Sequence, residues 1–130
     1  MNKLFIGLEL ATALKALGFD EECICFYKDG KLSITDQHWG SNISGISKEL
    51  GYRIDDLILA PTHQQVTDWL RDEHGIIIVV MPFLMEDNEI TYEYTNYTDK
   101  DQDEIDHGDG PYEDYYDALN AAIKSALSCI

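Results

Sequence analysis

The chain is short, acidic and of ordinary hydrophobic content. It has 130 residues, 45% hydrophobic and 11% aromatic, and its formal charge of −16 corresponds to a pI near 4.3. This length predicts a single domain, residues 1–130, able to bury a core without metals or disulfides. The charge opposes direct binding to nucleic acid and to anionic membranes, because the sequence has no cluster of lysine and arginine to release counterions.

The N-terminal part predicts one helix and one β-hairpin. Leucine and alanine recur at helical spacing over residues 3–17, and Gly18 suits the position just past a helix end. Two strand-like runs, residues 23–28 and 31–35, flank Asp29-Gly30. This dipeptide favours a two-residue hairpin turn, because both residues tolerate positive φ.

The middle of the chain predicts a loop, a short strand and a second helix. Residues 36–47 are rich in Gly, Ser and Asn and are typical of a loop, and residues 48–54 suit a helical turn. Residues 56–60 predict a third short strand. Thr62 and Gln65 form a capping-box pattern, so we expect a helix to begin at Thr62 and to stop at Gly75.

Two further strands and a final helix are expected after Gly75. Residues 76–85 are almost continuously apolar, which favours a central strand covered on both faces, although Pro82 indicates an edge or a bulge. After a turn at residues 86–88, residues 90–95 alternate as a half-buried strand does. The final helix follows Pro111, and its expected core residues are Tyr115, Leu119, Ala122, Ile123 and Ala126.

The order of these elements, α-β-β-(β)-α-β-β-α, predicts an α+β fold. Because hairpins supply most strand pairs, the economical architecture is a largely antiparallel sheet of four to five strands with about three helices packed on it. The sequence shows no internal repeat at the periods that mark solenoids or propellers.

Acidic residues concentrate in one segment. Thirteen of the 25 lie between Glu86 and Asp117, where Lys100 is the single base, so this segment carries a formal charge of −12. Six of the eight tyrosines lie there too, so the segment is both strongly negative and able to bury apolar area. Residues 98–110 predict an acidic loop within it.

This segment supports the one sharp hypothesis about function. We expect a non-catalytic accessory protein that binds another protein. Self-association of the chain is also compatible with this sequence. One alternative is a mimic of nucleic acid that inhibits a basic DNA- or RNA-binding host enzyme through residues 86–117. A second alternative assigns the segment no function. In it the charges solvate a loop and one strand face, and Tyr92, Tyr94 and Tyr115 belong to the core. The candidate partner-binding residues are Glu93, Tyr97, Asp99, Asp101, Asp103, Glu104 and Asp106.

Calcium-loop spacing is present only in part. Residues 99–103 place aspartates at alternate positions, as the first half of a calcium-binding loop does. The match then fails, because Glu104 stands where the turn needs glycine and Gly110 stands where a bidentate glutamate belongs. A loose cation site stays open, but we predict neither a specific metal site nor a cofactor.

Other residues with catalytic or ligand chemistry lack a supporting pattern. The four histidines and three cysteines show no zinc spacing, and Cys23 with Cys25 is not a CxxC motif. Two positions apart on a strand, these cysteines predict buried, reduced thiols and a cytoplasmic location. The loop at residues 40–45 lacks the lysine of a phosphate cradle. We therefore expect no enzymatic activity, and the 11-residue apolar run is too short to span a membrane.

Two sequence blocks resemble a known family. Residues 60–76 read A-P-T-H-Q-Q-V-T-D-W-L-R-D-E-H-G-I, and residues 115–124 read Y-Y-D-A-L-N-A-A-I-K. Both are similar to blocks in a family of small phage-type or prophage-type proteins of gut Bacteroidetes, although Asp72 departs from its pattern. The resemblance implies an origin in a mobile element and one α+β domain. It carries over no functional residue.

Overall fold

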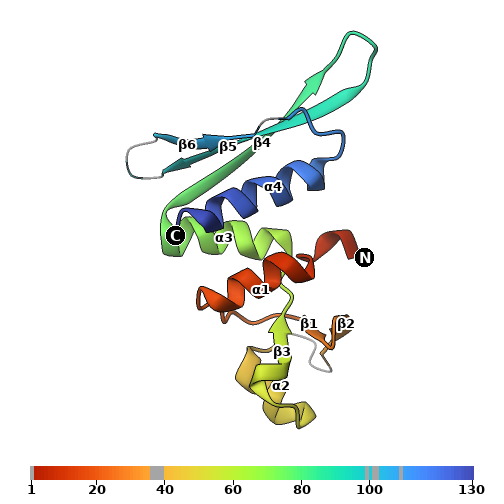
Figure 1. Cartoon of the computed structure of the whole chain (residues 1–130), viewed down its shortest axis with the longest axis vertical. Coiled ribbons are helices and arrows are strands. Elements are labelled where there is room, and N and C mark those ends of the chain that lie inside the picture. Colours follow the sequence, from red (N-terminus) through yellow and green to blue (C-terminus); the bar gives the residue numbers. More distant parts are fainter. Residues whose placement is uncertain (1, 36–39, 99, 101–102, 109) are drawn as a thin grey trace. The chain divides into compact units, whose positions relative to one another are not determined.

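The described part of the chain forms two units, each with its own three-stranded antiparallel sheet (Figure 1). A computed structural model describes residues 2–35, 40–98, 100, 103–108 and 110–130. The units span residues 1–64 and 65–130, and each is described by itself. The α+β class is confirmed. The expected single sheet with about three helices is wrong, because these residues hold two sheets and four α-helices. That the chain is one domain stays a prediction.

The first unit is a small sheet with helices. Its strands β1 (Cys25–Lys28), β2 (Lys31–Ile34) and β3 (Leu57–Leu59) lie in the order β2-β1-β3, and Phe5, Cys25 and Ala60 pack together in its core. The backbone N–H of Ile6 donates to the carbonyl of Pro61 at 2.9 Å, which ties the N-terminal segment to the end of β3. Its helices are η1 (Asn2–Leu4), α1 (Leu8–Ala16), α2 (Ile43–Leu50) and η2 (Ile54–Asp56).

The sequence predicted the hairpin of this unit correctly and the first helix in part. Asp29 and Gly30 adopt φ values of 54° and 77° in the turn between β1 and β2, as a two-residue hairpin requires. The expected helix over residues 3–17 begins only at Leu8, because Phe5 pairs as an isolated bridge with Thr62. A tertiary contact therefore overrides the helical spacing at its N-terminal end.

Helix α2 corrects the expected loop. The helix occupies Ile43–Leu50, inside a segment predicted as a loop followed by a helical turn. The side chain of Asn42 accepts a hydrogen bond from the N–H of Gly45, and Gly51 ends the helix at φ 72°. These are ordinary capping signals, but they lie among glycines and serines that favour a loop. Residues 36–39 of that expected loop lie outside the described residues.

Helix α3 (His63–His74) begins directly after Thr62 and ends before Gly75, as predicted. Gly75 has a φ of 65°, the left-handed conformation that commonly follows a helix. The helix starts at the last residues of the first unit and continues into the second. The short strand expected before it is confirmed as β3.

The second unit is an antiparallel sheet with one long helix on it. Its strands β4 (Ile76–Leu84), β5 (Ile90–Thr98) and β6 (Glu104–His107) lie in that order, and α4 (Tyr115–Ser128) packs against β4 and β5 (Figure 1). Asp114 caps α4 by accepting a hydrogen bond from the N–H of Tyr116. The residues that α4 buries are Ala118, Leu119, Ala122, Ile123, Ala126 and Leu127.

Three expectations for the second unit are wrong. Strand β4 was expected to be central, but it is an edge strand and every residue from Met81 to Leu84 is exposed. Part of the expected loop over residues 98–110 is strand β6, which pairs with β5. Tyr115 was expected in the core, but 43% of it is exposed. The first two outcomes depend on the order of the strands in the sheet, which the sequence does not show.

Candidate interaction surface

The sheet of the second unit has two faces, and α4 covers one of them. Asn96 points to α4, because its side-chain amide donates to the carbonyl of Ala122 at 3.0 Å. Side chains alternate between faces along a strand, and directly paired residues share a face. Every second residue of β5, counted in both directions from Asn96, therefore faces α4. The residues of β4 and β6 that pair with them face α4 as well. The remaining residues of the sheet point the other way.

We call this second side the open face. It carries four apolar side chains of β4 beside polar and acidic side chains of β5 and β6. Met81 lies directly opposite Glu93 in the strand pairing, so an apolar and an acidic side chain adjoin here. By register and alternation, the open face consists of Ile77, Val79, Met81, Phe83, Thr91, Glu93, Thr95, Tyr97, Glu104 and His107.

The structure brings three of the predicted partner-binding residues together. Tyr97 is paired with Glu104 across β5 and β6, and Glu93 lies further along the same face of β5. Glu93 and Glu104 are exposed, and Tyr97 is half-buried. Asp103 is also exposed and directly precedes β6. Asp99 and Asp101 lie outside the described residues.

Asp106 does not belong to this group. It pairs with Asn96 and so points toward α4, where its carboxylate accepts hydrogen bonds from the hydroxyls of Ser125 and Tyr94. The hydrogen bond from Ser125, followed by the one from Tyr94, lowers the pKa of Asp106 from its ordinary value of 3.8. The side chain therefore fastens β6 to α4 and β5, and its carboxylate is engaged within the unit.

The distal end of the β4–β5 hairpin is exposed on all sides. Every residue from Met81 to Ile90 is exposed, and Figure 1 shows the two paired strands running past the start of α4. Leu84 is 71% exposed and Ile90 is 52% exposed, although both are large and apolar. The turn between them carries Glu86 and Asp87. The sequence predicted a central strand covered on both faces, with Pro82 indicating an edge or a bulge in one segment, and it did not predict this exposed apolar surface.

The charge of this region is weakly compensated among the described residues. Glu104 forms an ion pair with His107 at 3.3 Å when the imidazole is protonated. The acidic residues exposed on the hairpin turn, on the open face and around the start of α4 are Glu86, Asp87, Glu89, Glu93, Glu104, Glu113 and Asp117. An approaching molecule thus meets carboxylates from several directions, which favours a basic partner.

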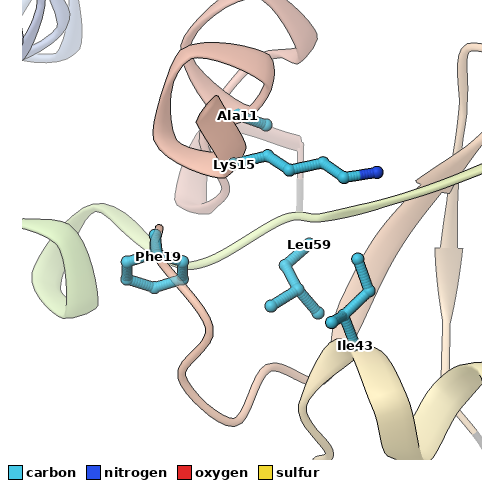
Figure 2. A pocket seen from close by; sticks show the side chains of 5 residues that line it. All are labelled: Ala11, Lys15, Phe19, Ile43 and Leu59. Carbon is cyan, nitrogen blue, oxygen red and sulfur yellow. The ribbon is translucent and has the colours of Figure 1, made fainter. Parts of the chain in front are cut away.

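A small cavity in the first unit is too small for a substrate. Its free volume is about 10 Å³, enough for about one water molecule. Figure 2 shows Lys15 above it, but the Lys15 ammonium donates to the carbonyls of Leu57 at 2.7 Å and of Ile54 at 3.0 Å. The charge of Lys15 therefore stabilises the segment before β3. The cavity is lined by Ala11, Lys15, Phe19, Ile43 and Leu59.

The cysteines of the first unit lack the features of nucleophiles. Burial, followed by the neighbouring Cys25, raises the pKa of Cys23 to about 12, and burial also raises the pKa of Cys25. Both thiols are free and buried. Over the described ranges of the chain, no three His, Cys, Asp or Glu side chains are grouped so that they would hold a metal ion.

Comparisons with known proteins add no relative: no protein-family model, no curated protein and no solved structure matches this chain. The resemblance to phage-type proteins stays a prediction. None of the helices in the described part is long and apolar enough to cross a bilayer.

Proposed function

We propose that this protein acts by binding another protein through the open face and the distal hairpin of its second unit. The observation that carries this proposal is the pairing of exposed apolar and acidic side chains, above all Met81 opposite Glu93. Met81 is 51% exposed and Phe83 is 43% exposed on the same strand face. Large apolar side chains of this kind supply the buried anchors of protein interfaces.

The acidic residues define the chemistry of the proposed partner. Glu93 and Glu104 are exposed on the open face, so a matching surface presents lysine or arginine opposite them and apolar pockets opposite Met81 and Phe83. Rim charges of this kind mainly steer association and make it depend on salt, whereas the buried apolar anchors supply most of the affinity. The proposed role is non-catalytic and cytoplasmic, and an origin in a mobile element rests on the sequence resemblance alone.

Mimicry of nucleic acid is the second candidate. It is favoured by the number of exposed carboxylates in this unit, but their placement supports it less well. Among the described residues, the exposed acids divide between the hairpin turn, the open face, the residue before β6 and the start of α4, whereas a mimic would present them in a row. Asp106, a member of the predicted set, bonds inward to Ser125.

An affinity capture with matched variants tests the proposal. The apolar variant carries Met81→Ser and Phe83→Ser, and its control is Ile34→Ser, which removes a side chain 58% exposed on β2. We expect an identified basic protein to be retained by the wild type and by the control but lost with the apolar variant. Retention by the apolar variant would contradict the proposed anchors.

A charge variant separates the two candidates. Glu93→Gln with Glu104→Gln removes two exposed carboxylates, and Glu49→Gln with Glu73→Gln removes two exposed acids elsewhere as a control. Binding through apolar anchors predicts an affinity loss of about tenfold or less for the first pair, because rim charges contribute modestly. Mimicry predicts near-complete loss and a steep decline with salt. An equal effect of the control pair would contradict a defined site in either case.

A further inference from the structure

Strand β4 leaves one edge of the second sheet unpaired. The sheet order is β4-β5-β6, and β4 pairs with β5 along all nine residues of Ile76–Leu84. No strand in the described part of the chain pairs with the other edge of β4. An edge of this length presents free backbone donors and acceptors that another strand can join.

The hydrogen bonds of β5 reveal which backbone groups β4 presents at this edge. Tyr92 exchanges both of its backbone hydrogen bonds with Tyr112, on the side of β5 away from β4. Its partner in β4, Pro82, therefore has its own backbone atoms directed to the open edge. By alternation, Ile78 and Val80 also direct their N–H groups outward. Pro82 has no N–H, so continuous pairing is available only from Ile76 to Val80.

Charge distinguishes the two edges of the sheet. Strand β6, the other edge, has four residues and carries Glu104 and Asp106, a common protection against pairing. Residues 75–85, which contain β4, have no charged side chain in a chain of net charge −16. A basic strand would find no carboxylate along β4. An identical copy would find an uncharged, β-branched strand with matching side chains.

We propose that two copies of this chain associate through antiparallel pairing of their β4 edges, with Ile78 at the two-fold axis. Ile76 then lies opposite Val80 of the partner copy, and Pro82 stays outside the paired segment. The two sheets become one sheet of six strands. On the open face, Ile77 is set opposite Val79 of the partner copy, which buries both side chains further. The pairing uses Ile77 and Val79 at one end of the open face and leaves Met81, Phe83, Glu93 and Glu104, the residues proposed to contact another protein, outside the paired segment.

The acidic strands oppose this association only weakly. Strands lie about 4.8 Å apart, so the two β5 strands are separated by about 14 Å across the new pair. That separation exceeds the screening length of about 8 Å at physiological salt. Association should therefore strengthen as salt is added, whereas binding to a basic protein weakens.

Sedimentation and amide exchange on the purified chain test this inference. We expect a concentration-dependent dimer whose dissociation constant falls about threefold or more between low and high salt. The amides of Ile78 and Val80 should exchange at least about tenfold more slowly in the dimer than in the dilute protein. Those of Ile77 and Val79, which bond to β5, should not change. A monomer at all concentrations, or a dimer without this alternation, would overturn the inference.

Two variants add an independent test. Val80→Pro removes an N–H directed to the edge, and Val79→Lys places a charge beside Ile77 of the partner copy. Both should be monomeric with an unchanged circular dichroism spectrum, whereas Phe83→Lys, on the same face but outside the paired segment, should remain dimeric. Retention of the dimer by both edge variants would refute this pairing. If a variant fails to fold, the amide exchange of the wild type still decides.

Discussion

Asn96 on β5 donates its side-chain amide to the main-chain carbonyl of Ala122 on α4, over 3.0 Å. Asn96 is fully buried, and its side-chain oxygen has no hydrogen-bond partner. A buried polar atom without a partner lowers the stability of the folded protein. The hydrogen bond from Asn96 in turn defines the position of α4 on the sheet.

Substitutions at Asn96 should separate its polarity from its volume. Asn96→Leu removes the unsatisfied oxygen and should change the free energy of unfolding by about 1 kcal/mol or less. Asn96→Asp places an unpaired carboxylate in the core and should cost about 3 kcal/mol or more at neutral pH. Urea unfolding at pH 7 and at pH 4 measures both. The deficit of the Asp variant relative to wild type should shrink at pH 4, where its carboxyl is protonated, and equal stabilities at pH 7 would contradict the buried placement.

Asp106 should contribute a pH-dependent part of the stability. Its pKa is lowered in the folded state by hydrogen bonds from Ser125 and Tyr94. The contribution is therefore present above the ordinary value of 3.8 and is lost as the pH falls through the lower folded-state value. Unfolding curves between pH 6 and pH 2.5 should show a shallower acid loss for Ser125→Ala than for wild type.

The matched control for this prediction is Asp103→Asn, which neutralises an exposed acid near β6. This control should keep the acid dependence that comes from Asp106. An acid dependence in Ser125→Ala identical to that of wild type would show that the hydrogen bond to Ser125 does not act on stability.

The three cysteines should differ in reactivity. Cys129 is exposed, whereas Cys23 and Cys25 are buried and their pKa values are raised. A thiol reagent at pH 8 should therefore modify one thiol per folded chain rapidly and two more only after denaturation. Cys129→Ser should abolish the rapid phase. Rapid loss of all three thiols in the native protein would contradict the packing of the first unit.

Gly40 should tolerate alanine less well than Gly18 does. Both adopt positive φ, 82° and 89°, so each substitution carries a backbone cost of about 1–2 kcal/mol. A Cβ at Gly40 would also lie 2.9 Å from the backbone carbonyl carbon and oxygen of Cys23, whereas the space beside Gly18 is open. Thermal unfolding should thus rank Gly40→Ala below Gly18→Ala. The reverse order would contradict the close approach of the backbone at Gly40.

Local signals in the sequence predicted local structure well. Asp29-Gly30 fixes its turn through backbone preferences that need no distant partner, and Thr62 and Gly75 mark the bounds of α3 in the same way. The first helix was predicted too long because the bridge between Phe5 and Thr62 joins residues far apart in the chain.

The candidate surface was harder to predict, because faces and edges depend on strand order. The apolar run of β4 suits a central strand equally well, and only its neighbours make it an edge. Composition alone predicts Glu93, Tyr97 and Glu104 as partner-binding residues, and the register of β5 and β6 gives them a common face. Composition predicts Asp106 in the same way, but its pairing with Asn96 directs its side chain toward α4.

The last hydrogen-bonded contact on the outer side of β5 is the bridge between Tyr92 and Tyr112. Beyond it the described hairpin is a ribbon of two strands, which is marginally stable alone in water. Opening should therefore begin at the turn and spread inward to Tyr92 without unfolding the base of the sheet. A partner that binds this two-stranded ribbon must also order it, so the cost of ordering reduces the free energy of binding. The expected complex is one that forms readily, is modest in affinity and can be exchanged.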